Sequence, residues 1–501
     1  MKQILFYILL CMPVFAFSQA KTTAKFAGTI TADDLRKHLT IIAGPEMEGR
    51  ETATEGQRKA AAYIENYFKS LGLQPGNGGS YQMQYPVYRD SITGASFAVN
   101  GMNFLPNVDF SVSSSNYPAT QRFGEMVFVN FDDSLWKNNK VDVSGKLVLF
   151  RFQGLQGQSQ NRMAFGNTVG IRVNSLMAKG AVAALAIQDI FPLARPADPL
   201  GNMTMDEMPS RQSINYFNIS PAAAKAILGS TDYEHAVADK LSCKTIKAKV
   251  EMQYAETQAK LSSSNVLGLL EGTDKKDEYL VITGHYDHLG KRDTVIYYGA
   301  DDDGSGTVSV LELAEAFVKA KAAGKGPRRS ILFMTVSGEE KGLWGSGYYA
   351  ANPAFPLKKT TANLNIDMVG RIDSLFGKTD TTNYVYVVGT DKLSSELNPI
   401  TLEANKQTKL HLSYKYDDPK DQQRIYFRSD HYNFAKNGVP IIFYFDGLHN
   451  DYHRPTDTVD KIEFDLMARR AQLVFFTAWD IANRPEMLKR DIPLPASALS
   501  R

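Results

Sequence analysis

In the second half of the chain, short apolar runs alternate with segments of helical periodicity. Apolar runs at residues 278–283, 331–336, 364–366, 384–388 and 441–445 predict strands, and residues 307–322 and 464–481 predict helices. Strands that alternate with helices predict a mixed, mostly parallel sheet with helices on both faces. The expected fold class is therefore α/β for this half.

The N-terminal part of the chain, after residue 20, is predicted to start with two amphipathic helices. Thr31 is a suitable N-cap for a short helix that carries Leu35 and Leu39 on one face. Residues 55–71 repeat apolar side chains at helical spacing. Residues 81–97 alternate in the manner of a strand, so a strand is expected to follow these helices.

The sequence pattern changes in the middle of the chain, from about residue 118. Buried-strand candidates at residues 126–129, 147–150 and 182–187 bring neither histidine nor paired carboxylates with them. We therefore expect residues 118–258 to form an inserted β-rich α/β module without catalytic chemistry. The expected catalytic domain is discontinuous, made of residues 21–117 and 259–485, with a C-terminal tail at residues 486–501.

Residues 1–20 resemble a secretory signal peptide. Lys2 supplies a positive start, residues 4–17 are almost wholly apolar, and small residues follow at 18–20. We expect export to the periplasm or the medium, and no membrane association after cleavage, because no later segment reaches spanning length. Cleavage would leave Cys243 as the sole cysteine, which excludes an internal disulfide.

Length and charge narrow the class of protein further. A chain of 501 residues exceeds the usual limit for one core, so two or more domains are expected. Hydrophobic residues make up 43% and charged residues 22%, which is typical of a globular protein. The formal net charge of +2, without a Lys/Arg stripe, argues against a nucleic-acid partner.

Five candidate metal ligands each follow a strand-like run. They are His285, Asp302, Glu340, Asp367 and His453. In parallel sheets, sites form beyond the carboxyl ends of the strands, so these side chains are expected to converge. Two imidazoles and three carboxylates are what two zinc-like ions require if one carboxylate bridges them. The pattern predicts metal-dependent hydrolysis.

The neighbours of these residues add to the case for chemistry. Three adjacent acids at 301–303 repel one another unless a cation offsets them, and Asp367 interrupts an apolar strand at a cost unless its charge is paired. Glu339 beside Glu340 suggests that one carboxylate binds metal while the other accepts a proton. Asp287 stands two residues after His285, where a carboxylate can fix the imidazole tautomer.

Five segments closely resemble the M28 family of zinc metallopeptidases, the aminopeptidase Y/leucyl aminopeptidase group. These segments are residues 284–290, 299–306, 337–347, 365–371 and 446–458, and the resemblance extends to Glu48-Gly49-Arg50. It covers about residues 30–110 and 264–485. Residues 118–258, with the sequence Val-Asp-Val-Ser-Gly-Lys at 141–146, look like the protease-associated (PA) domain often inserted in this family.

The resemblance implies a role for each candidate. His285 and Asp367 would hold one zinc ion, Glu340 and His453 the other, and Asp302 would bridge the two. Glu339 would be the general base. Asp287 would orient His285, and the peptide bond after Asp302 is expected to be cis.

These inferences predict a secreted di-zinc aminopeptidase that acts on peptides through metal-activated water. A carboxypeptidase or dipeptidase of the same family is an open alternative, and N-acetylated peptides would distinguish it. A glutaminyl cyclase, expected to hold one zinc ion, is a second alternative, and a non-catalytic binding protein is a third. The residue preference and the oligomeric state stay open.

Overall fold

The computed structural model describes residues 22–112, 116–152, 162–192, 200–207, 213–373, 382–418 and 421–496, so the expected signal peptide at 1–20 lies outside the described residues. The chain forms two compact units. One consists of residues 1–85 and 262–501, and the other of residues 86–261. No helix among the described residues combines the length and apolar character that crossing a membrane requires.

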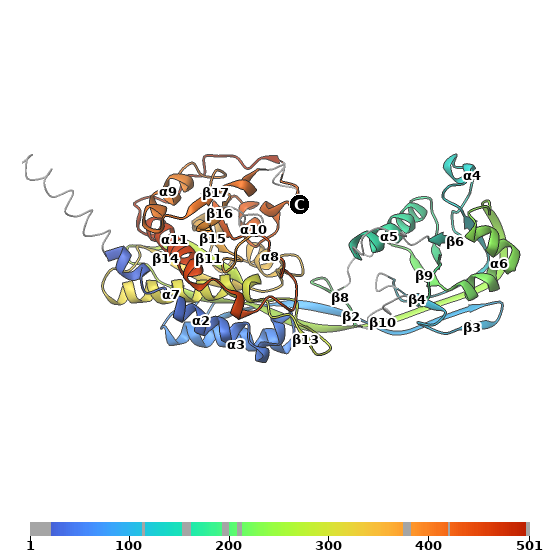
Figure 1. The fold of residues 1–501 in the computed structure, drawn as a ribbon, viewed down its shortest axis with the longest axis horizontal. Helices are drawn as coiled ribbons and strands as arrows, with labels where there is room; N and C mark the ends of the chain where they lie inside the picture. The colour runs from blue at the N-terminus through green and yellow to red at the C-terminus, as the bar shows by residue number, and fades with distance from the viewer. Residues whose placement is uncertain are drawn as a thin grey trace, which may run out of the picture. The chain divides into compact units, whose positions relative to one another are not determined.

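The first unit is built on a mixed, mostly parallel sheet, as the sequence predicted (Figure 1). Its strand order is β17 (His411–Ser413), β16 (Tyr384–Val388), β18 (Ile441–Phe445), β15 (Thr360–Ile366), β11 (Lys275–His285), β14 (Arg329–Val336) and β10 (Lys244–Leu270). β14, β11, β15 and β18 run parallel to one another, whereas β10 and β16 are antiparallel to their neighbours in this group. The carboxyl ends of four neighbouring strands therefore lie at one edge of the sheet.

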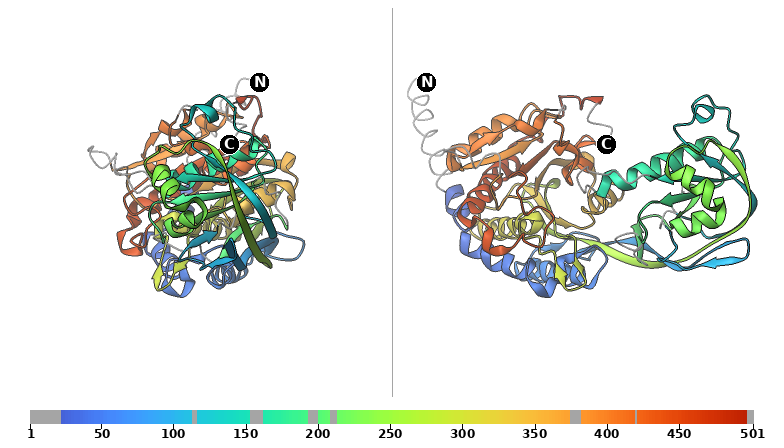
Figure 2. Two further views of the ribbon diagram at one scale, coloured as in Figure 1. Left: turned by 90° about the vertical axis from the view of Figure 1, so that its right-hand side faces the viewer. Right: turned by 45° about the vertical axis from the view of Figure 1, so that its right-hand side comes forward.

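Alternation along these strands divides the core into two layers. In β11, Leu280 and Ile282 face one layer and Val281 faces the other. The first layer is covered by α2 (Ala32–Ile42), α3 (Glu55–Ser70), α7 (Gly306–Ala322), α9 (Leu397–Thr408) and α11 (Phe464–Asn483), several of which are visible in Figures 1 and 2. The second is covered by α8 (Trp344–Ala351) and α10 (His431–Ala435). The sheet is thus buried on both faces, as a parallel sheet requires.

The N-terminal elements form where the sequence predicted them. Thr31 caps α2 by accepting a hydrogen bond from the Asp34 N–H, a contact worth about 1 kcal/mol. The short helix η1 (Pro45–Arg50) leads into α3, and β1 (Gln74–Pro75) and β2 (Gln82–Val99) follow. The first segment thus contributes two helices to the covering layer before the chain leaves the unit.

The second unit has its own sheet and core. Its strand order is β10, β5 (Ala119–Val129), β6 (Leu147–Phe152), β7 (Ala183–Gln188), β9 (Asn215–Ile219) and β4 (Phe110–Val112), with β5, β6, β7 and β9 parallel. It also holds α4 (Ser134–Lys137), α5 (Arg162–Ala178) and α6 (Pro221–Val237), and β2 pairs with β3 (Met102–Phe104) and β8 (Leu200–Thr204). This is an α/β module rich in strands.

The structure moves both predicted domain boundaries. The second unit begins at Pro86, not at residue 118, because Phe97, Phe104 and Phe110 pack into the same core as β5, β6 and β7. The chain enters this unit within β2 and returns within β10 at Ser262, close to the predicted residue 259. The single strand β2 crosses this boundary without a break, so the strand pattern gave no sign of the change.

The expected C-terminal tail is also part of the first unit. Leu488 is buried in its core, and the Leu488 N–H donates to Oγ1 of Thr361 at 2.9 Å. The fold of the first unit therefore continues beyond residue 485, at least as far as these contacts reach.

Candidate metal centre

The five predicted ligands converge at the carboxyl edge of the sheet. His285 ends β11, Glu340 follows β14, and Asp367 directly follows β15. His453 lies in the loop after β18, and Asp302 lies in η2 (Ala300–Ser305), the turn that leads into α7. Parallel neighbours end at the same edge, so strand order alone brings these loops together.

Asp302 stands between two groups of side chains. Its Oδ1 is 3.4 Å from Nε2 of His285, and that nitrogen is 3.6 Å from Oδ1 of Asp367. Its Oδ2 is 3.1 Å from Nε2 of His453, which is 3.2 Å from Oε2 of Glu340. One carboxylate thus faces both groups, each with a different oxygen.

These separations fit zinc ligands. Two donors bound at about 2.0–2.1 Å to one tetrahedral zinc ion lie about 3.3 Å apart. Nε2 of His285, Oδ2 of Asp302 and Oε1 of Glu340 are buried and form no hydrogen bond within the described part of the chain, although other polar atoms are close. Buried polar atoms are normally hydrogen-bonded. Buried ligand atoms that lie close together without a hydrogen bond are suited to binding one ion between them.

The centre has a surplus of negative charge. Burial by itself would lower the pKa of His453, but Asp302 and Glu340 raise it to about 10. Burial likewise opposes the charged form of His285, yet Asp367 and Glu339 raise its pKa well above 6.5. The carboxylates therefore favour positive charge on their neighbours, and divalent cations would supply it.

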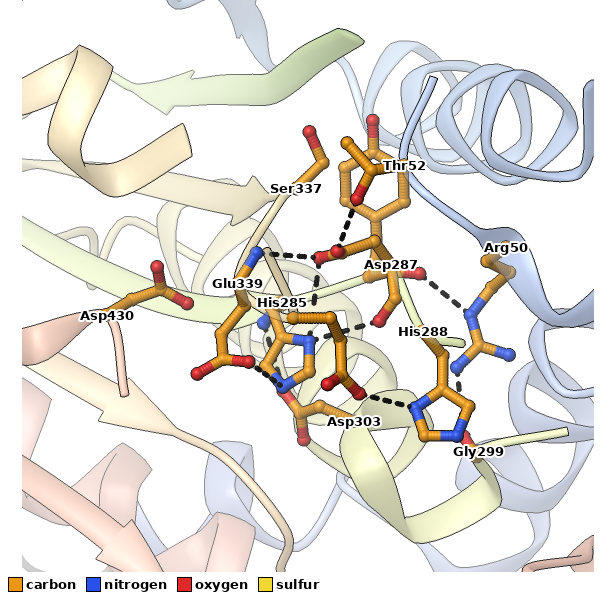
Figure 3. A network of polar contacts seen from close by, with 12 residues as sticks. Arg50, Thr52, His285, Asp287, His288, Gly299, Asp303, Ser337, Glu339 and Asp430 are labelled. Carbon is orange, nitrogen blue, oxygen red and sulfur yellow. Dashed lines mark hydrogen bonds and ion pairs between the residues drawn. The ribbon is translucent and has the colours of Figure 1, made fainter. Parts of the chain in front are cut away.

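Asp287 contacts two loops of the centre (Figure 3). Its Oδ1 accepts a hydrogen bond from the Glu339 N–H at 3.2 Å, and its Oδ2 accepts one from Oγ1 of Thr52 at 2.7 Å. Nδ1 of His285 lies 3.1 Å from the Asp287 backbone oxygen but 3.7 Å from its carboxylate. The expected orienting contact to His285 therefore comes from the main chain, while the carboxylate holds the Glu339 loop.

Asp303 ties three ligand-bearing segments together. Its carboxylate accepts hydrogen bonds from the N–H groups of His285 at 3.0 Å, Gly306 at 2.8 Å and Met368 at 3.0 Å. The Asp302-Asp303 peptide bond is cis, as the family resemblance implied. The position of Asp302 is thus fixed through its neighbour Asp303, which accepts main-chain hydrogen bonds from the end of β11 and from just past the end of β15.

Arg50 performs a similar task from the N-terminal segment (Figure 3). Its fully buried guanidinium donates to the backbone oxygens of Tyr286 at 2.7 Å, Tyr298 at 2.7 Å, Gly299 at 2.9 Å and Ile42 at 3.0 Å. Arginine presents several donors in a fixed plane, which suits this set of carbonyl groups. The side chain links η1 to the end of α2, to the loop after β11 and to the turn just before Asp302.

His288 also lies close to the centre. It is fully buried, and its Nδ1 is 2.9 Å from Oε1 of Glu340 and 3.8 Å from Oδ2 of Asp302. By separation alone, His288 can join Asp302 and Glu340 as a third ligand, and Glu339 can join His285 and Asp367. The sequence offered one sign of this role for His288: it lies three residues after His285, just past the end of a strand.

The distances favour His453 over His288 at the second group. Nε2 of His453 is 3.1 Å from Asp302 and 3.2 Å from Glu340, whereas His288 is close to Glu340 alone. His431 and His449 have structural contacts instead: Nε2 of His431 is 2.9 Å from the Tyr426 oxygen, and Nε2 of His449 is 3.2 Å from Oδ2 of Asp301.

A pocket opens beside the centre. Asp302, Glu339 and Asp367 form its polar end, and its other lining residues are Met368, Ile425, Arg428, Phe443, Phe445, Leu448 and Tyr452. Nη2 of Arg428 donates to the Tyr452 hydroxyl at 3.0 Å, and the Tyr452 ring stacks on His453 with centroids 3.9 Å apart. The sequence analysis singled out neither Arg428 nor Tyr452. A pocket with charged groups at one end and apolar side chains along its other walls suits a peptide side chain.

Comparison with known proteins agrees with this chemistry. The model of Peptidase family M28 matches residues 265–478. A probable zinc metalloprotease of Pyrenophora tritici-repentis is 28% identical over 281 residues, covering 47% of this chain and 55% of that protein. A probable leucine aminopeptidase of Arthroderma otae is 31% identical over 214 residues, covering 42% and 55%. The chain thus spans about half the length of the curated relatives it matches.

The fold also matches a solved structure over most of its length. The aminopeptidase from Aneurinibacillus sp. strain AM-1 superposes with a TM-score of 0.56 at 19% identity, covering 94% of this chain and 99% of that one. At this identity the match establishes the fold. It extends beyond the family model to include the second unit.

Proposed function

Residues 265–478 belong to peptidase family M28, and from this premise we propose that the protein is a zinc-dependent aminopeptidase that removes N-terminal residues from peptides. The observation that carries the proposal is the position of Asp302 between His285 and His453, each within 3.4 Å of a different carboxylate oxygen. Such an arrangement suits a pair of ions rather than a structural ion pair.

The proposed ligands divide into two sets. His285 and Asp367 would hold one zinc ion, Glu340 and His453 the other, and Asp302 would contact both. Two zinc ions bound there would polarise the scissile carbonyl and lower the pKa of the attacking water. The structure of the protein contributes the fixed loops that keep these five side chains at the separations described above.

Glu339 is the proposed general base. It lines the pocket beside the ligands, and its Oε2 is 4.0 Å from Nε2 of His285. It accepts the proton of the attacking water and delivers it to the leaving amine. Asp287 keeps it in place by accepting the hydrogen bond of its backbone N–H.

The peptide's N-terminal residue is proposed to occupy the pocket next to the centre. Ile425, Phe443 and Leu448 give that pocket an apolar wall, which suits an apolar side chain. The acidic end of the pocket, formed by Glu339 and Asp367, is suited to a positively charged α-amine. A free amine is therefore expected to be required.

The test is a panel of aminoacyl chromogenic substrates, each offered with a free and with an acetylated amine. Turnover of the free forms, its loss with a chelator and its return with zinc support the proposal. Equal or better turnover of acetylated peptides would identify a carboxypeptidase, and ammonia release from N-terminal glutamine a cyclase. No turnover of any peptide would indicate a binding protein and contradict the proposal.

Export and the role of the second unit are part of the same proposal. The N-terminal pattern at residues 1–20 supports secretion to the periplasm or the medium. We assign the unit at residues 86–261 to the protease-associated type, on the sequence resemblance and on its strand-rich α/β core. N-terminal sequencing of the exported protein would locate the cleavage site, and retention of residues 1–20 would contradict secretion.

A further inference from the structure

Three hydroxyl groups meet beneath the loop that carries the proposed base. Oγ of Ser337 lies 2.7 Å from the Tyr85 hydroxyl and 2.7 Å from Oγ of Ser263. All three side chains are buried, and Ser337 stands two residues before Glu339. Figure 3 shows Ser337 and Glu339 on the same loop. The cluster lies outside the proposed ligand set.

The direction of these hydrogen bonds follows from counting donors. Oγ of Ser337 is 2.8 Å from the Ser264 backbone oxygen, which can only accept, so Ser337 donates its one proton there. Its two lone pairs then accept from Tyr85 and Ser263. Burial raises the pKa of Tyr85 well above 10, so its hydroxyl keeps the proton that it donates. Every hydrogen-bonding position of Ser337 is filled.

The Tyr85 hydroxyl also leaves no room for a side chain at the next residue, Gly338. Gly338 has a φ of +71°, and a Cβ added there would lie 2.8 Å from the Tyr85 hydroxyl oxygen and 2.9 Å from Cβ of Trp344. Glycine is therefore required on both conformational and steric grounds. Tyr85 thus contacts the side chain of Ser337 and the backbone of Gly338, the two residues directly before the base.

Two residues of this cluster, Tyr85 and Ser263, come from the two strands that lead into and out of the inserted unit. Tyr85, in β2, is the last residue of the first segment of its unit, and Ser263, in β10, is the second residue after the chain returns. Neither belongs to the motifs that hold the ligands. Their contact with Ser337 lies within one compact unit, so its geometry is independent of where the other unit lies.

We propose that Tyr85 is a positioning residue for Glu339, acting through Ser337 and Gly338. The inference rests on the proposed function, because it concerns the residue that holds the proposed base, Glu339, in place. Asp287 holds the loop at the Glu339 N–H and Tyr85 holds it on the preceding side, so Glu339 is fixed from both directions. A small displacement of a catalytic group is enough to lower turnover, because a 1 Å misplacement costs about 100-fold.

The test is Tyr85→Phe, which keeps the ring and removes only the hydroxyl. The expected result is a kcat lower by roughly 10- to 100-fold, with KM and zinc content unchanged. Substrate and metal contacts are intact in this variant, whereas the base is not held. Tyr349→Phe is the matched control: another buried tyrosine of the same unit, on α8, whose ring packs against Phe434. Its kcat is expected to equal that of the wild type.

A second variant separates positioning from general damage. If Tyr85 acts through Glu339, Tyr85→Phe lowers the residual rate of a Glu339→Gln enzyme by less than about 2-fold, because the base is already absent. Ser263→Ala combined with Tyr85→Phe should also cost less than the product of the single effects, since both act on Ser337.

The possible outcomes distinguish the two proposals. Wild-type turnover together with an unchanged kcat for Tyr85→Phe overturns the inference alone. An equal loss in the wild-type and Glu339→Gln backgrounds also overturns it, because the effect then does not pass through the base. Absence of wild-type turnover overturns the proposed function and the inference with it.

Discussion

The two carboxylate oxygens of Asp302 face different histidines, Oδ1 lying 3.4 Å from Nε2 of His285 and Oδ2 lying 3.1 Å from Nε2 of His453. The side chain is almost fully buried, and Asp303 and Asp457 hold the turn around it through main-chain hydrogen bonds. No other side chain in the described centre contacts both histidines in this way. Asp302 is therefore the residue on which a two-ion site depends.

Asp302→Asn tests that dependence. The amide keeps the shape of the side chain but replaces one anionic oxygen with an NH2 group, which cannot bind a cation. We expect zinc content to fall from two ions per chain to one or fewer, and turnover to fall by at least about 100-fold. Metal analysis by mass spectrometry measures the first effect. Asp277→Asn, at an exposed position on β11, is the control, and two retained ions in Asp302→Asn would contradict bridging.

Glu339→Gln should separate metal binding from proton transfer. Glutamine has the same size and cannot accept the proton of the attacking water, so kcat is expected to fall by about 10²- to 10⁴-fold. Zinc content should stay at two ions, because Glu339 is outside the proposed ligand set. Glu403→Gln on the exposed face of α9 is the matched control. Near-normal turnover in Glu339→Gln would exclude the residue as the base.

The strands of the first unit and the polar residues at their carboxyl ends could be predicted from the sequence, because the two patterns agree with each other. Apolar runs predicted β11, β14, β15 and β18, and parallel neighbours end at one edge, so the four ligands that follow these strands were expected to meet. Asp302 lies instead in η2, the turn before α7. The cis bond at Asp302-Asp303 came from family resemblance and not from the pattern itself. Periodicity and spacing thus predicted the loops that the structure brings together at this edge.

Side chains that act from a distance along the chain could not be predicted. Tyr85 is 252 residues from Ser337, and Arg50 is 249 residues from Gly299, so no local pattern links either pair. The boundary at Pro86 was missed for a similar reason, since one continuous strand, β2, passes between two cores. Tertiary contacts alone decide these features.

His453→Ala and His288→Ala should differ if the distances identify the ligand. His453 is 3.1 and 3.2 Å from Asp302 and Glu340, so its loss is expected to remove one zinc ion and most activity. His288→Ala should keep both ions, because its contact is to Glu340 alone at close range. Each variant serves as the control for the other in zinc analysis. Loss of an ion from His288→Ala alone would reverse the assignment.

Removal of metal should lower stability as well as activity. Three carboxylates and Glu339 crowd the centre, and cations that bind the folded state stabilise it by about 4 kcal/mol per ion at 1,000 times Kd. A chelator is therefore expected to lower the unfolding temperature, and added zinc to restore it. Calorimetry with and without chelator measures the shift. An Asp302→Asn protein should show a smaller shift, and an equal one would place the stabilising metal elsewhere.

Arg50→Met should destabilise the first unit strongly. The substitution keeps an apolar stem but leaves four backbone oxygens without the donor that now satisfies them, among them those of Tyr286 and Gly299. Buried acceptors without partners cost about 1–3 kcal/mol each, so a loss on the order of 3 kcal/mol or more is expected. The zinc-loaded protein should unfold at a lower urea concentration with an unchanged slope. Arg58→Met on the exposed face of α3 should change the free energy of unfolding by less than about 0.5 kcal/mol. Equal urea midpoints for the two variants would contradict a structural role for Arg50.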